Sequence, residues 1–313
     1  MSRQCTGQFS IVKAAPIMEA ASRMPDKVTI NRIALSAYRN YRSASMTFDG
    51  RHVVLTGENG AGKTNLLEAI SFLSPGRGLR RATYADVGLQ GDGAGFSIYA
   101  EVDGMEGSVE IGTGLATSDG AVRKVRINGT DAKSADELLD HLRILWLTPA
   151  MDGLFTGPAS DRRRFLDRLV LSLDPAHGRR AADFERAMKM RNKLLEDGRY
   201  DPDWMRSIEK QMAGLGVAMA LARGELVSLL EHLGERGDVG ATFPAADLAL
   251  SGFLDADLAR PAVDLEDVYA DLLERSRPRD QAAGRTLEGP HRADLVVRHR
   301  QKSIEASLCS TGE

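Results

Sequence analysis

Residues 57–64 read Gly-Glu-Asn-Gly-Ala-Gly-Lys-Thr and decide the fold class of this chain. They match the pattern G-x-x-x-x-G-K-[ST], in which glycines allow consecutive backbone N–H groups to surround phosphate oxygens. An apolar run at 51–56 precedes the motif and favours a buried strand, and residues 65–73 follow with apolar side chains at helical spacing. Strand, glycine-rich turn and helix form the context that a phosphate-binding P-loop requires.

The motif predicts a role for each of its parts. Lys63 is expected to bridge the phosphates of a nucleoside triphosphate, and Thr64 to bind Mg²⁺ through its hydroxyl. Asn59 and Asn65 are expected to shape the loop, and direct contact with the ligand is an open alternative. A chance glycine-rich turn before a helix is the other interpretation of the whole run. The predicted site for ATP and Mg²⁺ consists of Gly57, Glu58, Asn59, Gly60, Ala61, Gly62, Lys63, Thr64 and Asn65.

The composition is that of an ordinary globular chain. A length of 313 residues fits two domains or one domain with a large insertion. Of these residues, 42% are hydrophobic and 27% are charged, which is ordinary for a globular protein. The net charge of −3 excludes a global basic field, so any DNA contact must come from local arginine clusters. Two cysteines exclude a disulfide framework and favour a reducing cytoplasm. We expect no membrane contact, because no apolar run approaches the roughly 20 residues that span a bilayer.

The N-terminal half is predicted to contain an extension and an α/β lobe. Residues 1–26 show no period and are expected to form a flexible extension, for which Met18 and Met24 offer alternative starts. Residues 27–155 contain strand-like runs, a tight-turn signal at 128–129, a capped helix after Ser134 and an apolar strand at 143–147. We expect this segment to form the first part of an α/β lobe, which the resemblance described below implies to be an ATPase lobe.

The second half is predicted to be mainly helical. Residues 156–284 contain long segments with helical spacing and are expected to form an inserted helical lobe. Strand character returns at 294–298 and 303–308, so residues 285–313 are expected to rejoin the ATPase lobe. The predicted helices lie at 159–173, 175–197, 203–236 and 263–275.

The last residues form a second candidate motif. Residues 308–313, Leu-Cys-Ser-Thr-Gly-Glu, resemble the signature of ATP-binding-cassette (ABC) ATPases, in which the usual core is L-S-G-G. Ser310 and Gly312 match that core, whereas Thr311 replaces its first glycine. In that class the signature of one subunit covers the nucleotide on the P-loop of the other. The resemblance therefore implies that Ser310, Thr311 and Gly312 contact nucleotide across a dimer; an ordinary helix N-cap is the alternative.

Further motifs identify a family. Residues 38–41 read Tyr-Arg-Asn-Tyr, residues 157–167 read Gly-Pro-Ala-Ser-Asp-Arg-Arg-Arg-Phe-Leu-Asp, and residues 289–295 read Gly-Pro-His-Arg-Ala-Asp-Leu. Together with the P-loop, these motifs make residues 27–313 resemble the RecF family, a branch of the SMC-like ABC ATPases. The resemblance implies an α/β ABC-type ATPase lobe with a mixed sheet and an inserted, mainly helical lobe.

The same resemblance implies a function. RecF proteins are ATP-dependent homodimers that bind DNA at junctions of double- and single-stranded regions. They act with RecR and RecO to direct RecA onto gapped DNA during recombination, repair, replication and the SOS response. They hydrolyse ATP slowly, so that the nucleotide acts mainly as a dimerisation switch.

The sequence departs from the family pattern at its end. A Walker B strand with an acidic pair follows the signature in this family, but this sequence ends at Glu313. We therefore expect a C-terminally truncated member without the carboxylates that organise Mg²⁺ and the attacking water, and we assign no catalytic residue. Gln90 is a poor candidate for the Q-loop glutamine of other ABC ATPases.

Arginines supply the remaining candidates. Arg39 lies in a predicted turn beside the P-loop strand. The resemblance to SMC-like proteins implies that it reaches the nucleotide, and a solvated turn is the alternative. The cluster at 162–164 begins a helix, where the helix dipole disfavours cations, which favours a phosphate or carboxylate partner. The candidates for DNA contact are Arg77, Arg80, Arg81, Arg162, Arg163 and Arg164.

Two other functions stay open at this point. A P-loop kinase or phosphotransferase explains the phosphate-binding motif alone, and no lid or acceptor site is evident for it. A non-catalytic fragment is the other alternative, and it predicts weak nucleotide binding without turnover.

Overall fold

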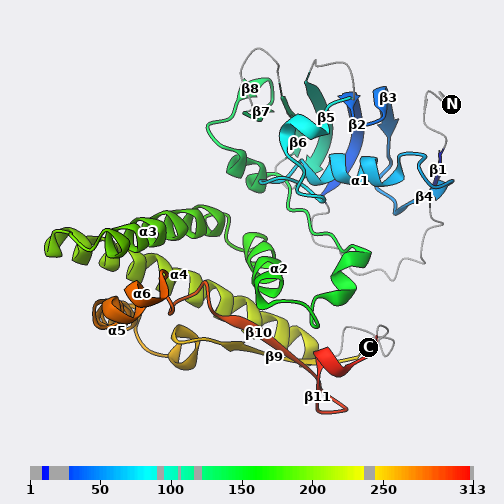
Figure 1. Ribbon diagram of the computed structural model, residues 1–313. Coiled ribbons are helices and arrows are strands. Elements are labelled where there is room, and N and C mark those ends of the chain that lie inside the picture. Colours follow the sequence, from blue (N-terminus) through cyan, green and yellow to red (C-terminus); the bar gives the residue numbers. More distant parts are fainter. Residues whose placement is uncertain are drawn as a thin grey trace. The chain divides into compact units, whose positions relative to one another are not determined.

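The computed structural model describes residues 9–13, 28–89, 95–104, 107–115, 122–235 and 244–310. The chain divides into two compact units, Met1–Trp146 and Leu147–Glu313 (Figure 1). The boundary thus falls before the predicted one at 155. Residues 285–310 lie in the second unit instead of rejoining the first, because their main strand pairs with another strand of that unit.

The first unit is built on an antiparallel sheet with the strand order β3-β2-β5-β6-β7-β8. Alternate residues of β2 and β5, among them Ile33, Leu35 and Ile98, are buried on one face, as a half-buried sheet requires. The turn at Asn128-Gly129, where both residues have positive φ, joins β7 to β8 and confirms the predicted tight turn. The strands are β2 Thr29–Tyr38, β3 Tyr41–Thr47, β5 Phe96–Gly104, β6 Gly107–Leu115, β7 Lys124–Ile127 and β8 Thr130–Asp131.

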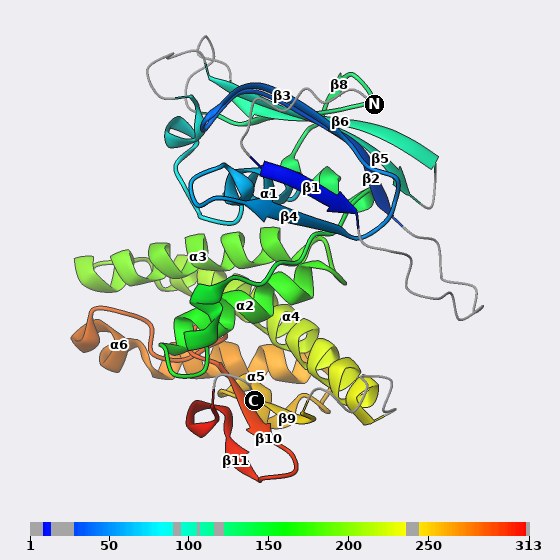
Figure 2. The same cartoon turned by 90° about the vertical axis from the view of Figure 1, so that its right-hand side faces the viewer.

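Helix α1, Lys63–Ser71, covers the buried face of this sheet (Figure 2). Its Leu66 and Ala69 join Phe72 in the core of the unit, where the Phe72 ring lies 5.9 Å from that of Phe96. The short helices η1, Tyr84–Val87, and η3, Ala135–Asp140, complete the unit. Ser134 and Glu137 form a capping box at η3, which confirms the predicted helix start, although the turn is 3₁₀.

The P-loop strand does not lie in that sheet. Strand β4, Val53–Gly57, pairs antiparallel with β1, Phe9–Lys13, and with no other strand of the described residues. The prediction of a buried strand is wrong, because Val53 and Val54 are 37% and 51% exposed. The expected flexible extension does not hold for β1, whose pairing satisfies backbone groups at the edge of β4; the rest of 1–26 lies outside the described residues.

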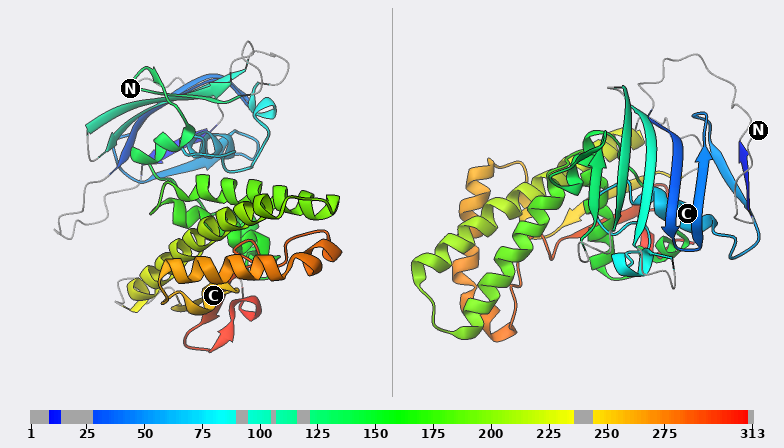
Figure 3. Two further views of the ribbon diagram at one scale, coloured as in Figure 1. Left: turned by 90° about the vertical axis from the view of Figure 1, so that its left-hand side faces the viewer. Right: turned by 90° about the horizontal axis from the view of Figure 1, so that it is seen from above.

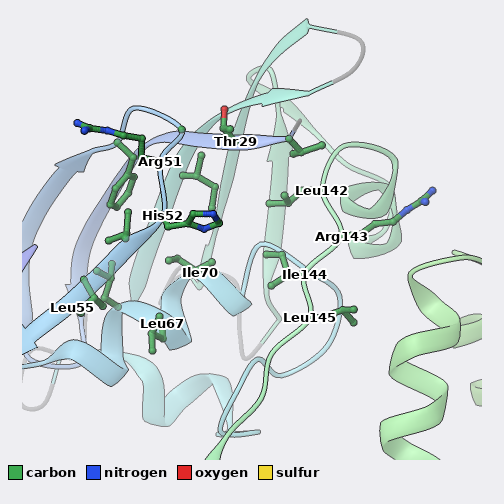
Figure 4. A pocket seen from close by; sticks show the side chains of 16 residues that line it. Thr29, Arg51, His52, Leu55, Leu67, Ile70, Leu142, Arg143, Ile144 and Leu145 are labelled. Carbon is green, nitrogen blue, oxygen red and sulfur yellow. The ribbon is translucent and has the colours of Figure 1, made fainter. Parts of the chain in front are cut away.

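A groove of about 470 Å³ runs beside β4 and α1. Leu55, Leu67, Ile70 and Ile144 surround it, together with His52 (Figure 4). The predicted strand at 143–147 is not formed: these residues have no ladder partner among the described residues, and a strand needs one to satisfy its backbone.

The second unit is mainly helical, as predicted. The α3–α4 hairpin is its longest feature (Figure 3), and α4 packs against α2, α3, α5 and β9. An antiparallel sheet of order β11-β10-β9 completes the unit. The helices are α2 Ala159–Leu171, α3 His177–Asp197, α4 Pro202–Glu235, α5 Ala262–Arg275 and α6 Arg277–Ala283, with short η4 Pro149–Gly153, η5 Leu254–Asp257 and η6 Ala306–Leu308; the strands are β9 Ala246–Ser251, β10 Asp294–His299 and β11 Ile304–Glu305.

Helix α4 is the core helix of this unit. In the described part of the chain it alone is long and apolar enough to cross a membrane by length and composition. Its Met205, Met212 and Leu226 are buried inside the unit, however, and its Arg223 is paired with Asp167. The apolar character of α4 is therefore explained by packing.

Candidate nucleotide-binding site and arginine clusters

The loop between β4 and α1 has the backbone of an anion-binding site. Gly57, Gly60 and Gly62 have φ values of 144°, 84° and 99°, a region that side chains rarely allow. The backbone N–H groups of Gly60, Gly62, Lys63 and Thr64 have no hydrogen-bond acceptor among the described residues. They lie at the positive end of α1, where an anion is stabilised.

Side chains of the loop fit a nucleotide phosphate and its metal ion. Lys63 Nζ donates to the carbonyl oxygens of Gly57 and Glu58, at 2.7 Å each, so its charge lies over its own loop. A bound phosphate would replace these neutral acceptors by a stronger, charged one. Thr64 is exposed, and its hydroxyl has no partner in the described part of the chain, which leaves it open to bind Mg²⁺.

The Tyr-Arg-Asn-Tyr segment at 38–41 packs against the P-loop at Gly62. Tyr41 Oη donates to the carbonyl oxygen of Gly62 over 3.0 Å. A Cβ at Gly62 would lie 2.6 Å from that hydroxyl and 2.9 Å from Asn40 Nδ2, so only glycine fits here. The glycine before Lys63 is thus required by close packing as well as by its φ.

Glu68 organises the arginines near the P-loop and was not singled out in the sequence. Its side chain is fully buried, at 0% exposure, and it accepts from Arg39 Nη2 over 2.7 Å and from Arg39 Nε over 2.9 Å. Arg80 Nη1 donates to the same carboxylate over 3.2 Å. A glutamate on the apolar face of a predicted helix, beside Leu66 and Ala69, was the available signal, because a buried carboxylate needs a cationic partner.

Arg39 is consequently held by protein groups. Besides Glu68, it donates to the carbonyl oxygen of Asp86 over 2.7 Å, and the hydrogen bond to Glu68 raises its pKa. The structure brings Arg39 close to the P-loop helix, as expected, but gives its guanidinium a carboxylate partner. The predicted contact between Arg39 and nucleotide stays a prediction.

Asn65 is also engaged at both ends of its amide. Its Nδ2 donates to Asn40 Oδ1 over 2.7 Å, and its Oδ1 accepts from Arg80 Nη1 over 2.8 Å. These bonds match the expectation that Asn65 shapes the loop.

Arg77 and Arg81, in contrast, are exposed, and neither guanidinium has a partner among the described residues.

The cluster at 162–164 in the second unit has local partners. Arg162 donates to both carboxylate oxygens of Asp294 over 2.8 Å each, and this bonding lowers the pKa of Asp294. Arg163 donates to the carbonyl oxygen of Ala293 over 2.8 Å, and burial lowers its pKa. Arg164 pairs with Asp161 in the same helix. The sequence predicted a phosphate or a carboxylate as partner, and in the structure Arg162 and Arg164 are paired with carboxylates.

The Gly-Pro-His-Arg segment is held by buried contacts of the second unit. Arg223 donates to the carbonyl oxygen of Pro290 over 2.7 Å and to both oxygens of Asp167. Gly289 has φ 132°, and a Cβ there would lie 2.0 Å from Tyr269 Oη. These contacts give the segment a structural role in joining α4, α5 and β10.

Part of the predicted signature is described. Ser310 follows η6, and Thr311 and Gly312 lie outside the described residues, as does Gln90. Across the described ranges, no group of three His, Cys, Asp or Glu side chains could hold a metal ion.

Comparisons with known proteins identify the family. Residues 29–230 match the family described as RecF/RecN/SMC N terminal domain. The DNA replication and repair protein RecF of Rhizobium johnstonii is 66% identical over 291 residues, which cover 93% of this chain and 78% of that protein. RecF of Rhizobium meliloti is 64% identical over the same length, with the same coverage.

Solved structures show the same fold. A structure of the recombination mediator protein RecF-ATP in the RecFOR pathway aligns with a TM-score of 0.78 at 19% identity, covering 90% of this chain and 76% of that chain. A second structure, with the nucleotide named ATPrS, aligns with a TM-score of 0.77 at 20% identity, covering 87% and 74%. The predicted fold class, an α/β ATPase fold with helices, is confirmed, and the described strand pairs are antiparallel. On sequence and fold together, the chain belongs to the RecF family of DNA replication and repair proteins.

Proposed function

We propose that this protein is an ATP-dependent DNA-binding protein of recombinational repair. The P-loop carries the proposal: free backbone amides, glycines with positive φ, Lys63 and the open hydroxyl of Thr64 converge at the start of α1. Such a site binds a triphosphate and its Mg²⁺. The names of its relatives, which combine RecF, ATP and DNA repair, support the same assignment.

The nucleotide is proposed to act as a switch. Bound ATP would be held by the loop amides and Lys63, and Thr64 would hold Mg²⁺ against the phosphates. We propose that ATP promotes a homodimer in which Ser310, Thr311 and Gly312 of one copy meet the P-loop of the other. Family membership favours this function over a P-loop phosphotransferase, whereas the non-catalytic alternative stays open to an ATP hydrolysis assay.

Family membership supports a proposal for the partners. We propose that the protein binds gapped DNA through exposed arginines and helps RecR and RecO to load RecA in the cytoplasm. The candidate contacts are the clusters at 77–81 and 162–164, of which the first has unpaired side chains.

Replacement of Lys63 tests the nucleotide site. Lys63→Ala is expected to weaken Mg²⁺-ATP binding by about 100-fold or more, because it removes the charge that bridges the phosphates. Isothermal titration calorimetry measures this loss, and Lys210→Ala on the exposed side of α4 is the matched control. Equal ATP affinity in wild type and Lys63→Ala, or DNA binding that ignores ATP, would refute the proposed function.

A further inference from the structure

We propose that residues 75–81, here named the arginine loop, form a preorganised contact for the phosphodiester backbone of DNA. Arg77 and Arg81 bind the phosphates, and Arg80 does not: it tethers the loop to the P-loop helix. This inference rests on the proposed DNA binding, and it separates the arginines that meet the ligand from those that hold the loop in place.

The start of the loop is fixed by Arg123. Its Nη1 donates to the carbonyl oxygens of Gly76 over 3.0 Å and of Ser74 over 3.2 Å, and its Nη2 donates to that of Phe72. Its Nε donates to Thr113 Oγ1, and its guanidinium lies 5.5 Å from the centre of the Phe72 ring. All these partners are neutral, so this cation is stabilised by carbonyl groups at the negative end of α1. Arg123 thereby joins the end of the helix to the sheet.

The middle of the loop lies directly on α1. Leu79 N donates to Ser71 Oγ over 2.7 Å, and that hydroxyl donates to the carbonyl oxygen of Glu68. Gly78 has φ 66°, and a Cβ there would lie 2.8 Å from Ser71 Oγ. The backbone can approach the helix this closely only without a side chain at residue 78.

The end of the loop is tethered by Arg80. Its Nη1 donates to Asn65 Oδ1 and to Glu68 Oε2, a carboxylate with no exposure to solvent. The Arg80 side chain is 41% exposed, and a DNA phosphate would have to compete with this buried carboxylate for Nη1, the donor of both bonds. Because Asn65 follows Thr64, Arg80 also connects the arginine loop to the first turn of the P-loop helix.

Arg77 and Arg81 remain available for a ligand. Both are exposed, and their guanidinium groups have no hydrogen bond or ion pair within the described ranges. Arg81 has φ 55°, a left-handed conformation that non-glycine residues seldom adopt, and local strain of this kind gathers at functional sites. A loop fixed at its start, middle and end loses little conformational entropy when these side chains bind. Guanidinium groups in such a loop suit phosphate oxygens.

The salt dependence of DNA binding distinguishes a phosphate contact from a tether. We would measure the affinity for a fluorescent gapped duplex, with ATP and Mg²⁺, over a series of salt concentrations. Arg77→Gln and Arg81→Gln are each expected to make the negative slope of log K against log salt shallower by about 0.7–0.9 and to weaken binding roughly fivefold to eightfold at 0.1 M salt. Arg80→Gln is expected to leave the slope unchanged.

Matched variants complete the experiment. Arg126→Gln is the control, because Arg126 is an exposed arginine of the same unit whose partner is Asp131. Gly78→Ala retains every charge but displaces the loop, and it is expected to weaken DNA binding while ATP affinity is kept. The inference is overturned if Arg77→Gln or Arg81→Gln leaves the slope unchanged, if Arg80→Gln makes it shallower by a full contact, or if Gly78→Ala binds DNA as wild type does. A wild-type protein that binds no DNA would instead refute the proposed function.

Discussion

The arginine clusters at 77–81 and 162–164 are similar in sequence, but they differ in how many of their arginines are paired by the fold. In the second unit, Arg162 is bonded to both oxygens of Asp294, a residue far away in the chain. In the first unit, Arg77 and Arg81 have no partner among the described side chains. A run of arginines in the sequence therefore shows where positive charge lies along the chain. Whether those guanidinium groups are available to a ligand depends on carboxylates that the fold brings close from distant positions.

The largest expected effect is the loss of stability when Arg162 is removed. Arg162→Ala leaves Asp294 without its partner, and Arg162 is only 14% exposed. We expect the second unit to lose about 3 kcal/mol of unfolding free energy. Urea denaturation measures the loss, and Arg164→Ala, which removes an exposed pair with Asp161, should cost less than about 0.5 kcal/mol. Equal stability of the two variants would show that the Asp294 pair is not structural.

Double variants compare the contributions of the two arginine clusters to DNA affinity. The double variant Arg77→Gln/Arg81→Gln should lower DNA affinity by roughly 50-fold at 0.1 M salt, since each phosphate contact contributes about sevenfold there. The double variant Arg163→Gln/Arg164→Gln should change it less than about twofold. Fluorescence anisotropy with a gapped duplex measures both. A larger loss in the second variant would reverse the assignment of the two clusters.

Replacement of Glu68 tests whether the stability of the first unit depends on the ion pairs of Arg39 and Arg80 with this carboxylate. Glu68→Gln keeps the shape of the side chain but leaves Arg39 and Arg80 beside a neutral amide in a buried position. We expect the first unit to lose about 2 kcal/mol of unfolding free energy. Thermal denaturation followed by circular dichroism measures it, and Glu110→Gln, on the exposed face of β6, is the control. Unchanged stability would mean that solvent replaces the carboxylate.

The smallest expected effect is a dependence of stability on pH. The hydrogen bond from Arg162 lowers the pKa of Asp294, so the ionised form contributes stability that is fully present above the unfolded pKa of about 3.9. That contribution is lost as pH falls from there through the lower folded pKa. Unfolding free energies between about pH 6 and pH 3 should therefore fall less in Asp294→Asn than in wild type. Parallel pH profiles for the two proteins would contradict this expectation.

Local sequence patterns predicted much of the fold. Helical spacing located α2, α3, α4 and α5 to within a few residues, because a long amphipathic period is a strong signal. Short apolar runs were less reliable. The run at 143–147 forms no strand, and residues 303–308 form only β11 and η6, because strand formation depends on a partner that the run itself does not specify.

The sequence alone predicted the phosphate-binding loop and identified the family. Glycines, Lys63 and Thr64 act through a single strand–turn–helix segment, so their spacing in the chain fixes their spacing in space. Only the tertiary structure decided which arginines are paired. Glu68 and Asp86 accept hydrogen bonds from Arg39, and Asp294 accepts from Arg162, each from a different element of the fold. Ion pairs between distant residues require folded geometry, and no local pattern records it.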